Sequence, residues 1–582
     1  MKIPPENWKV EKIAVVGPGI VGMPMAAMLA NARIHINNDA PAKVVVIQRN
    51  SSTSGWKVAA INSGRSVIGG IEPELDRIVA ESVAENLLYA SHDYRELRDA
   101  DVILVCVQTD KIAMEPDYGP LIEALAHIAQ ALKEKPENKK PLIIFESTLA
   151  PSSVATIIKG HFHKYGLFEG RDIILGNSPN RVMPGRLVER VAKSDKLIGG
   201  LRHDTTAMIE KLYGHIVKEA KLYTTNSLTA EVVKTFENAY RDIRIAFAAE
   251  MVRYCDENGI DFYKVRELVN KRLLQSDRAS FENGTVPSGG VLIPTIGVGG
   301  HCLPKDGILL AWRKFEHFGV DPNSLILEAR KINDESPSQT IKLAERHFGS
   351  LRGKSIALMG AAYRFNSEDT RNSPSLFLAK LLIEMGCNVT LHDPYVKADD
   401  QKVKLFKLSP YFYKDAGRAI SSAEYIIYCT AHKEYKSGYT NHFKLAPKLK
   451  GIVDGCNLLE SIEIDALKAP YVGIGKGKRP PTTEFIEFVF NSFKVIEKGT
   501  ANELFEIIRY LNENYADDEF NRIDFNDVQR IAGTCITGCT IVDPGSVESA
   551  PSYKGFVSRI VKCAKQAWDK NNCGKENLDI VA

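Results

Sequence analysis

The sequence predicts an α/β protein with two doubly wound, Rossmann-like parallel-sheet domains. A helical central domain with a long helix joins them, and a small C-terminal extension follows. Short apolar segments alternate with helical patterns through the first 150 residues, and a second alternation of this kind begins at Lys354. Uninterrupted apolar strands separated by helices are typical of parallel sheets covered on both faces. The region between the two alternations has a helical pattern, which indicates two separate sheets.

The first alternating region begins with a strand, a glycine turn and a helix. Strands are expected, in chain order, at residues 12–16, 43–47, 102–107 and 142–145, with further strands near 173–175 and 196–198. A helical pattern over residues 23–32 follows the first strand across the turn. This succession is the arrangement found at the start of a dinucleotide-binding domain.

One long helical pattern dominates the central region. It runs from Thr229 to Asn258, and Gly259 ends it as a C-terminal cap. More helix is expected to about Leu274, whereas residues 275–300 are rich in Gly, Pro and Ser and predict a loop. Two more helices are expected at residues 304–318 and 325–333.

The second alternating region differs from the first in its loop motifs, so the two are not a tandem repeat. Strands are expected at residues 355–359, 388–391, 425–428, 452–453 and 471–474, with a helix at 375–385. The pattern changes again near residue 490. We therefore expect domains at residues 1–225, 226–340, 341–488 and 489–582, the last of unknown role.

Composition excludes several classes of protein. The 582 residues carry a net charge of +3, which gives no electrostatic case for nucleic acid. No apolar run is long enough to span a bilayer, and the N-terminus has no apolar core of the signal-peptide type. The ten cysteines lie mostly in apolar contexts, which favours a reducing compartment, the cytoplasm. The C-terminal cysteines fit no strong zinc template, so no metal site is expected: Cys535, Cys539, Cys563 and Cys573.

The turn after the first strand has the pattern G-x-G-x-x-G. Gly17 permits the tight turn, Gly19 lets a pyrophosphate approach the backbone, and Gly22 packs the helix on the strand. The N–H groups at the start of the helix can bind the phosphates. The cofactor-binding residues expected here are Gly17, Gly19, Ile20, Val21 and Gly22.

The end of the second strand leaves the choice of dinucleotide open. NAD sites usually have Asp or Glu at this point, but this sequence has Gln48 followed by Arg49. A glutamine can still hydrogen-bond the ribose hydroxyl, whereas an arginine can accommodate a 2′-phosphate. We expect NAD, with NADP as the alternative.

A single thiol lies in the octapeptide that runs from Gly299 to Asp306. The glycines before Cys302 allow a ligand to approach the backbone closely, and Lys305 can favour the nucleophilic thiolate. The adjacent Asp306 can activate a water molecule, so the stretch contains the groups needed to form and hydrolyse a thioester. The alternative is a glycine turn with an inert, buried cysteine.

Polar residues also follow one face of the long helix. Lys234, Asn238 and Asp242 are spaced at i, i+4 and i+8, which places them on the same side. A lysine here can stabilise a developing alkoxide. The alternative is a solvated polar stripe.

With these motifs in this order, residues 1–480 resemble the UDP-glucose/GDP-mannose 6-dehydrogenase family. The resemblance implies oxidation of the C6 alcohol of a nucleotide sugar to a carboxylate in two NAD-dependent steps, through a thiohemiacetal and a thioester on Cys302. It further implies that Thr148 hydrogen-bonds the reacting group or water, that Lys234 and Asn238 donate to the C6 oxygen, and that Asp306 assists water attack. Thr109 and Thr148 are also expected to contact the cofactor.

The resemblance also implies the substrate-binding residues and a dimer built on the long helix. The second sheet is expected to hold the UDP moiety. The residues expected at the substrate are Asn180, Arg181, Val182, Lys234, Asn238, Arg241, Gly299, His301, Arg364 and Arg371. At position 180 the family carries a glutamate that is a proposed acid/base, and Asn180 cannot exchange a proton at neutral pH.

The form Gly-Gly-His-Cys is more similar to the branch that acts on UDP-N-acetylhexosamines than to the UDP-glucose branch, which commonly has Ser before the cysteine. Three alternatives remain: a UDP-glucose 6-dehydrogenase, a two-electron hydroxy-acid dehydrogenase, and a nucleotide-sugar sensor without catalysis. The joint presence of Cys302, Lys305, Asp306, Lys234 and Asn238 argues against the sensor.

Overall fold

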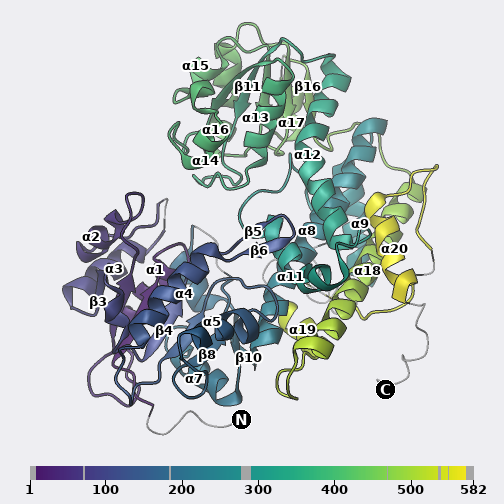
Figure 1. The fold of residues 1–582 in the computed structure, drawn as a ribbon. Coiled ribbons are helices and arrows are strands. Elements are labelled where there is room, and N and C mark those ends of the chain that lie inside the picture. The colour runs from purple at the N-terminus through teal and green to yellow at the C-terminus, as the bar shows by residue number, and fades with distance from the viewer. Residues whose placement is uncertain are drawn as a thin grey trace. The chain divides into compact units, whose positions relative to one another are not determined.

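The computed structural model describes residues 8–69, 72–181, 185–276, 290–467, 469–534, 539, 541–547 and 549–571. The chain forms two compact units (Figure 1). Unit 1 comprises Met1–Glu237, Ile308–Val320 and Phe505–Gly538. Unit 2 comprises Asn238–Gly307, Asp321–Leu504 and Cys539–Ala582. The expected four-part division remains a prediction, but the C-terminal extension is shared between the two units.

Unit 1 is built on an eight-stranded sheet of order β10-β9-β8-β7-β4-β1-β2-β3. All neighbouring strands are parallel except β8 and β9, which are antiparallel. In chain order the strands are β1 (Lys12–Val16), β2 (Lys43–Ile47), β3 (Leu88–Ser91), β4 (Val102–Val105), β7 (Leu142–Phe145), β8 (Ile174–Asn177), β9 (Lys196–Gly200) and β10 (Leu222–Asn226). A separate hairpin joins β5 (Asp110–Ile112) and β6 (Glu115–Asp117).

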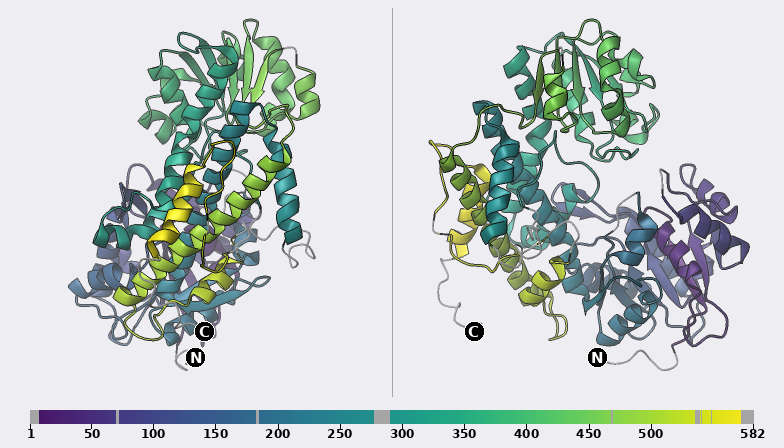
Figure 2. Two further views of the ribbon diagram at one scale, coloured as in Figure 1. Left: turned by 90° about the vertical axis from the view of Figure 1, so that its right-hand side faces the viewer. Right: turned by 180° about the vertical axis from the view of Figure 1, so that it is seen from behind.

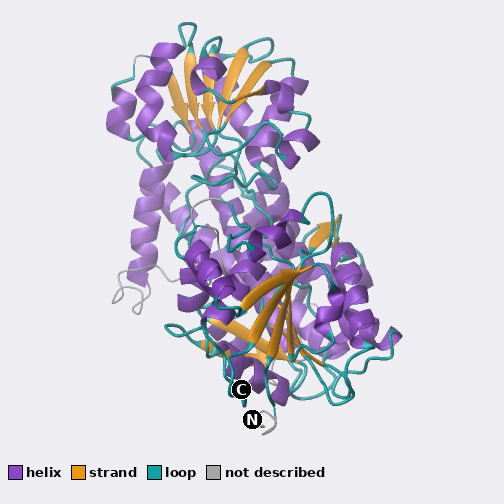
Figure 3. Cartoon of the chain, turned by 90° about the vertical axis from the view of Figure 1, so that its left-hand side faces the viewer, coloured by secondary structure: helices purple, strands orange, loops and turns teal. Residues whose placement is uncertain are grey.

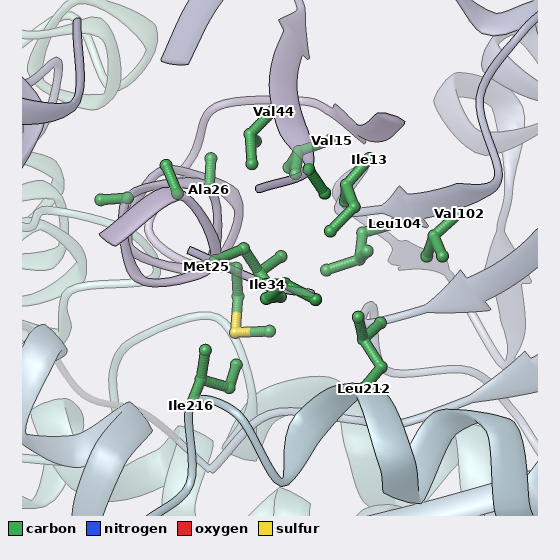
Figure 4. Packing of buried hydrophobic residues seen from close by; sticks show 14 of the residues in the cluster. Ile13, Val15, Met25, Ala26, Ile34, Val44, Val102, Leu104, Leu212 and Ile216 are labelled. Atoms are coloured by element: carbon green, nitrogen blue, oxygen red, sulfur yellow. The ribbon is translucent and has the colours of Figure 1, made fainter. Parts of the chain in front are cut away.

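Helices cover both faces of this sheet, as the alternating sequence pattern predicts (Figure 3). They are α1 (Gly22–Asn31), α2 (Trp56–Asn62), α3 (Leu75–Ala84), η1 (Tyr94–Leu97), α4 (Gly119–Leu132), η2 (Val154–Ile158), α5 (Lys159–Lys164), α6 (Leu187–Lys193) and α7 (His203–Tyr213). On one face, Ile13 and Leu104 of the strands pack with Met25 of α1 and Leu212 of α7 (Figure 4). The apolar strands are therefore buried on both sides, and this burial holds the β1–α1 turn in place.

Unit 2 contains a six-stranded, entirely parallel sheet of order β13-β12-β11-β14-β15-β16. Its strands are β11 (Ser355–Met359), β12 (Asn388–His392), β13 (Phe412–Tyr413), β14 (Tyr425–Tyr428), β15 (Gly451–Asp454) and β16 (Tyr471–Gly473). Its helices are α13 (Pro374–Glu384), α14 (Gln401–Leu405), η3 (Ser409–Tyr411), α15 (Ala416–Ile420), α16 (Lys433–Leu445) and α17 (Ser461–Asp465).

Longer helices make up the central and C-terminal regions. They are α8 (Ser227–Asn258), α9 (Phe262–Ser276), α11 (Leu303–Phe318), α12 (Leu325–Phe348), α18 (Thr483–Tyr515), α19 (Phe525–Ala532) and α20 (Arg559–Asn571). Figure 2 shows α18 and α20 from two further sides. None of the helices in the described ranges is long and apolar enough to cross a membrane.

The fold class predicted from sequence is confirmed, and most element boundaries shift by only a few residues. Strands β3, β10 and β13 and the β5–β6 hairpin were not expected. Helix α12 continues well past Asn333, where the sequence pattern ended it, and it contains Pro337. A proline interior to a helix is unfavourable, so tertiary packing of α12 overrides the local signal.

Candidate active site

The glycine turn between β1 and α1 has the geometry of a dinucleotide site. Gly17 has φ +94°, a conformation that a side chain would strain. A Cβ on Gly22 would collide with the carbonyl oxygen of Gly17, so α1 must pack closely here. By contrast, apart from Gly19 itself and its two chain neighbours, no atom lies within 4 Å of the Cβ position of Gly19. The turn therefore leaves open the place where a pyrophosphate approaches the backbone, and the residues fit the cofactor.

The residues at the end of β2 favour NAD over NADP. Gln48 is half-buried and its Nε2 donates to Ser54 Oγ at 3.0 Å. Arg49 forms an exposed ion pair with Glu123 at 2.7 Å, so its guanidinium already has an anionic partner. Sequence reasoning missed Lys57, whose Nζ donates to the Pro18 carbonyl at 3.2 Å and so lies beside the glycine turn. Burial lowers the pKa of Lys57.

The loop after β7 carries Thr148 and is anchored by buried groups. Thr109 Oγ1 donates to the Thr148 carbonyl oxygen at 2.6 Å. The carboxylate of Glu231, on α8, accepts from the backbone N–H groups of Ser152 at 2.7 Å and Val154 at 2.9 Å. Burial raises the pKa of Glu231 to about 8. Sequence reasoning missed Glu231, although a lone acid among the apolar residues before Lys234 was a signal.

Asn180 lies in a buried polar cluster around Glu146. Its side-chain amide donates to Glu146 Oε2, and the hydroxyl of Tyr213 donates to Glu146 Oε1. Lys196 Nζ lies 2.9 Å from the same carboxylate. Burial raises the pKa of Glu146. Position 180 thus carries an amide where the family has an acid, but a carboxylate lies within hydrogen-bonding distance of it.

Arg181 is held by residues distant in the sequence. Its side chain is 9% exposed and pairs with Glu237 of α8. Its Nη1 also donates to Thr534 Oγ1 at 2.9 Å, and its Nη2 donates to the Ile531 carbonyl at 3.3 Å. Both partners at the end of α19 belong to the C-terminal extension, which sequence reasoning did not connect with this loop. The predicted substrate residue Val182 falls outside the described residues.

The polar residues of α8 are buried rather than solvated. Lys234 lies in unit 1 and is buried. In unit 2, the amide of Asn238 donates to Asp306 Oδ2 at 2.6 Å. Asp242 binds Arg330 at 2.7 Å and Asn333 at 2.8 Å, both on α12.

These contacts exclude a solvated stripe and give the α8 residues different tasks. Asp242 anchors α8 to α12, and burial raises its pKa to about 6. Asn238 belongs to the cluster around Asp306. The predicted substrate residue Arg241 is half-buried on the same helix.

Cys302 lies exposed at the N-terminus of α11. The backbone N–H groups of Lys305 and Asp306 donate to its carbonyl oxygen at 3.1 and 2.9 Å, which starts the helix. The partial positive charge of a helix N-terminus lowers a thiol pKa and favours the thiolate. The exposure of Cys302 excludes the alternative of a buried cysteine, and its reactivity remains a prediction.

Lys305 and Asp306 bind each other, whereas the sequence suggested that Lys305 favours the thiolate of Cys302 and that Asp306 activates a water molecule. Lys305 is 2% exposed and Asp306 is 0% exposed, and their charged atoms lie 2.6 Å apart. The ammonium is thus compensated by Asp306, and the start of α11 is the better source of thiolate stabilisation. Because the Asp306 oxygens bind Lys305 and Asn238, the carboxylate positions these groups within the protein.

In unit 2 the cysteine loop packs against the segment that follows β11. The Gly300 N–H donates to the Arg371 carbonyl at 2.8 Å, and Asn372 Nδ2 donates to the Gly300 carbonyl at 2.9 Å. A side chain on Gly299 would collide with Tyr363. The structure therefore brings together two motifs that lie some 60 residues apart in the sequence, as 299–302 and 363–372 show.

The predicted substrate residues of this region have protein partners. Arg371 pairs with Asp369 at 2.6 Å, and Arg364 lies 5.7 Å from the ring centroid of Phe365. His301 is half-buried next to Cys302. Roles of these residues at the sugar nucleotide remain predictions. Within the described ranges, no group of His, Cys, Asp and Glu side chains could hold a metal ion.

An open glycine turn between a parallel strand and a helix is typical of a dinucleotide-dependent oxidoreductase, and this chain also carries an exposed thiol at a helix N-terminus. Matches to family models identify the group. Residues 11–217 match the NAD binding domain of the UDP-glucose/GDP-mannose dehydrogenase family, 228–335 its central domain, and 357–461 its UDP binding domain. The chain belongs to this family, as its motifs predicted.

Characterised relatives cover most of the chain. It is 31% identical to a UDP-N-acetyl-D-mannosamine dehydrogenase of Pyrococcus horikoshii over 471 residues, which are 80% of this chain and 99% of the relative. A solved structure of a UDP-D-ManNAc dehydrogenase from that organism has a TM-score of 0.66 at 30% identity, with the same coverage. An NDP-N-acetyl-D-galactosaminuronic acid dehydrogenase from Methanosarcina mazei has a TM-score of 0.66 at 29% identity, over 81% of this chain and 96% of its own.

Proposed function

We propose that this protein is an NAD-dependent nucleotide-sugar 6-dehydrogenase that oxidises the C6 alcohol of a UDP-sugar to a carboxylate. Family membership and the matches to NAD binding and UDP binding domains support this function. The observation that carries it is Cys302, exposed at the start of α11 beside the buried Lys305–Asp306 pair and Asn238.

The substrate is a UDP-N-acetylhexosamine. The relatives described above are named for N-acetylated sugars, one N-acetyl-D-mannosamine and the other N-acetyl-D-galactosaminuronic acid. The Gly-Gly-His-Cys form of the cysteine loop points to the same branch. UDP-glucose is the alternative, and an assay with both sugars separates them.

The reaction removes four electrons from one carbon. Two NAD molecules each accept a hydride, and this is the chemistry that the cofactor supplies. The alcohol first becomes an aldehyde, with loss of a hydride and a proton. Cys302 Sγ adds to the aldehyde to give a thiohemiacetal, and loss of the second hydride and proton leaves a thioester. One water molecule then releases the carboxylate and restores the thiol, with net release of a third proton.

The chain's own residues bind and polarise the reacting group. Lys234 and Asn238 donate to the C6 oxygen, and Thr148 hydrogen-bonds the reacting group or water. Asp306 orients Asn238 through the bond at 2.6 Å. For Asp306 to assist water attack, water must replace one of its two protein partners.

Thioester hydrolysis at this centre does not use an acid at position 180, because that residue is Asn180. Its amide donates to the carboxylate of Glu146, whose pKa is raised by burial. Asn180 therefore acts as an oriented hydrogen-bonding group.

The cysteines within the described residues are in the reduced form, which supports a protein of the reducing cytoplasm. A sugar nucleotide, and not nucleic acid or membrane, is the partner that the net charge of +3 and the family support. A homodimer or higher homo-oligomer was expected from the resemblance.

A panel of UDP-sugars assayed with NAD and with NADP tests this function. We expect two NADH per sugar, formation of the uronic acid and preference for NAD. One NADH per sugar would instead indicate a two-electron hydroxy-acid dehydrogenase. No reduction with any UDP-sugar, although NAD binds, would favour a sensor.

A further inference from the structure

Helix α18 begins at Thr483, a few residues before the expected domain boundary, so the C-terminal extension is taken from here on as residues 483–571. It lies beyond the part of the chain that the family models match, which ends at residue 461. The Pyrococcus horikoshii relative is aligned over 99% of its length but only 80% of this chain. The extension is therefore additional to the shared enzyme. Within unit 2 the extension contacts the central helices α8 and α12.

Aromatic side chains of the extension pack on α8. Phe493 lies with its ring centroid 5.8 Å from that of Phe247, which is fully buried. Tyr254 stacks on Phe485 at 5.2 Å and on Phe556 at 4.6 Å. Aromatic pairs of this kind contribute strongly to the stability of cores and interfaces. These contacts therefore hold the extension against α8 at Phe247 and at Tyr254.

A carboxylate of α8 caps a helix of the extension. Glu250 Oε2 accepts from the Ser558 hydroxyl at 2.5 Å and from the Ile560 N–H at 3.0 Å, and Oε1 accepts from the Arg559 N–H at 3.0 Å. Glu250 is buried, so its hydrogen bonds to the start of α20 replace those that it would make to water. Its negative charge also lies at the favourable end of α20.

A carboxylate of the extension caps a central helix in return. Glu503, on α18, accepts from the Ser324 hydroxyl at 2.6 Å and the Leu325 N–H at 2.8 Å, at the start of α12. Helix α20 is also joined to α12, because Arg559 of α20 binds Glu328 at 2.6 Å and Glu335 at 2.9 Å. The extension and the central helices thus each provide a carboxylate that accepts hydrogen bonds at the start of a helix of the other.

The helices of the extension also pack tightly on each other. A Cβ on Gly499 of α18 would lie 2.5 Å from the Cβ of Ala564 of α20, and Figures 1 and 2 show these helices side by side. Together with α12 they leave no residue of α8 between Asn238 and Cys255 in the exposed class. No open face of α8 remains in this stretch.

We propose that the C-terminal extension is a built-in partner of α8. It occupies, within one chain, the helix face that a second copy would need, so the protein does not self-associate through residues 238–255. This inference replaces the sequence-based expectation that the long helix forms a dimer core. It does not rest on the proposed function, because its test requires no substrate.

The first test is the mass of the full chain by light scattering over a wide range of concentration, combined with amide exchange of α8 and α20. We expect a monomer of 64.5 kDa. A dimer whose α8 and α20 peptides exchange equally before and after dilution also agrees with the proposal, because its interface lies elsewhere. A dimer whose α8 or α20 peptides gain exchange on dissociation would overturn it.

The second test displaces α20 in the full chain. Gly499→Leu places a side chain against Ala564, and Lys562→Ala on the exposed side of α20 is the matched control. We expect exchange in α20 to rise at least about tenfold in the first variant alone, with a concentration-dependent increase in mass. Faster exchange in α20 with an unchanged monomer mass would contradict the proposal.

Glu250→Gln provides a second displacing variant in case Gly499→Leu does not fold. The amide keeps the size of the side chain but has one acceptor oxygen for the three donors at the start of α20. The same rise in exchange and in mass is expected, to a smaller extent. A folded, strictly monomeric Glu250→Gln protein with a released α20 would again contradict the proposal.

Discussion

The two parallel sheets each have a glycine at the turn after the first strand, but only one turn is open. In unit 1 the space at the Cβ position of Gly19 is empty to 4 Å, apart from its two chain neighbours. In unit 2 the corresponding turn after β11 is filled by the protein itself, because Asp393 Oδ2 accepts from the N–H groups of Ala361 at 2.8 Å and Ala362 at 3.0 Å. His432 Nε2 lies 3.0 Å from the same oxygen.

This difference shows how one architecture serves two purposes. Backbone N–H groups at such a turn can bind a phosphate. In unit 1 the N–H groups of Gly17 and Gly19 donate to the carbonyl oxygens of Ile47 and Gly17, both at 2.9 Å, and the turn offers a dinucleotide the open space beside Gly19. In unit 2 the N–H groups of the turn donate to a carboxylate of the protein. Burial alone would raise the pKa of Asp393, but the hydrogen bond and charge of His432 and the backbone donors lower it. The UDP binding sheet therefore needs a different surface for its nucleotide.

The largest effect is expected at the closed side of the unit 1 turn. Gly22→Val would force α1 away from the Gly17 carbonyl, and the overpacking should destabilise the protein by about 3 kcal/mol or more. Thermal unfolding and the yield of folded protein measure this. A Gly22→Val protein as stable as the wild type would show that the turn is not closely packed.

Gly19→Val tests the open side of the same turn. Because the space around Gly19 is empty, the variant should fold and unfold like the wild type. Its side chain would occupy the place of the pyrophosphate, and loss of charge-assisted hydrogen bonds should weaken NAD binding by about 10- to 100-fold. Calorimetric titration with NAD gives the affinity. Unchanged affinity would locate the dinucleotide elsewhere.

Stability should depend on pH through carboxyl groups that behave oppositely in the two units. The pKa of Glu231 is raised from 4.5 to about 8, so the folded state holds its proton more tightly than the unfolded state. Its contribution to stability is full below about pH 4.5 and is lost as the pH rises through 8. Asp393 has a lowered pKa, so its contribution is present above its usual pKa of 3.8 and is lost as the pH falls below it.

Glu231→Gln should therefore reduce the decline in unfolding free energy between pH 5 and 8, while retaining the shape of the side chain. Chemical denaturation at several pH values measures this decline. An equal decline in the variant and in the wild type would contradict a buried, proton-holding Glu231.

The smallest effect is expected for Asp393→Asn. An amide can keep one acceptor oxygen towards Ala361 and Ala362, but its NH2 group would then face the N–H groups of Tyr395 and Val396, which now donate to Asp393 Oδ1. The loss should be about 1–3 kcal/mol in unit 2, with NAD affinity unchanged. Denaturation and NAD titration together test this. Weaker NAD binding without loss of stability would contradict the claim that NAD binds at the unit 1 turn and that Asp393 only closes the unit 2 turn.

The sequence was most informative where the chemistry is local. The roles of Gly17, Gly19 and Gly22 follow from their spacing between a strand and a helix, and the geometry agrees with all three. The position of Cys302 at the start of α11 also follows from the helical pattern after it. Local patterns determine such features because the interacting residues are only a few positions apart.

Other parts of the site could not be predicted because they depend on distant residues. Asp393 fills a turn more than 30 positions away, and Thr534 holds Arg181 across 353 positions. The partner of Asn180 is a buried carboxylate on another strand end. The sequence shows that these residues are polar. Only the fold shows whether the side chain of each one faces a ligand or another part of the protein.

The central claim is that a covalent bond forms between Cys302 and the sugar carbon. Rapid acid quench of the enzyme turning over with NAD and a UDP-N-acetylhexosamine, followed by peptide mass spectrometry, tests it most directly. We predict an acyl adduct on the peptide that contains Cys302, and no carboxylate from Cys302→Ser even though that variant binds NAD. Full carboxylate formation by Cys302→Ser would contradict the account.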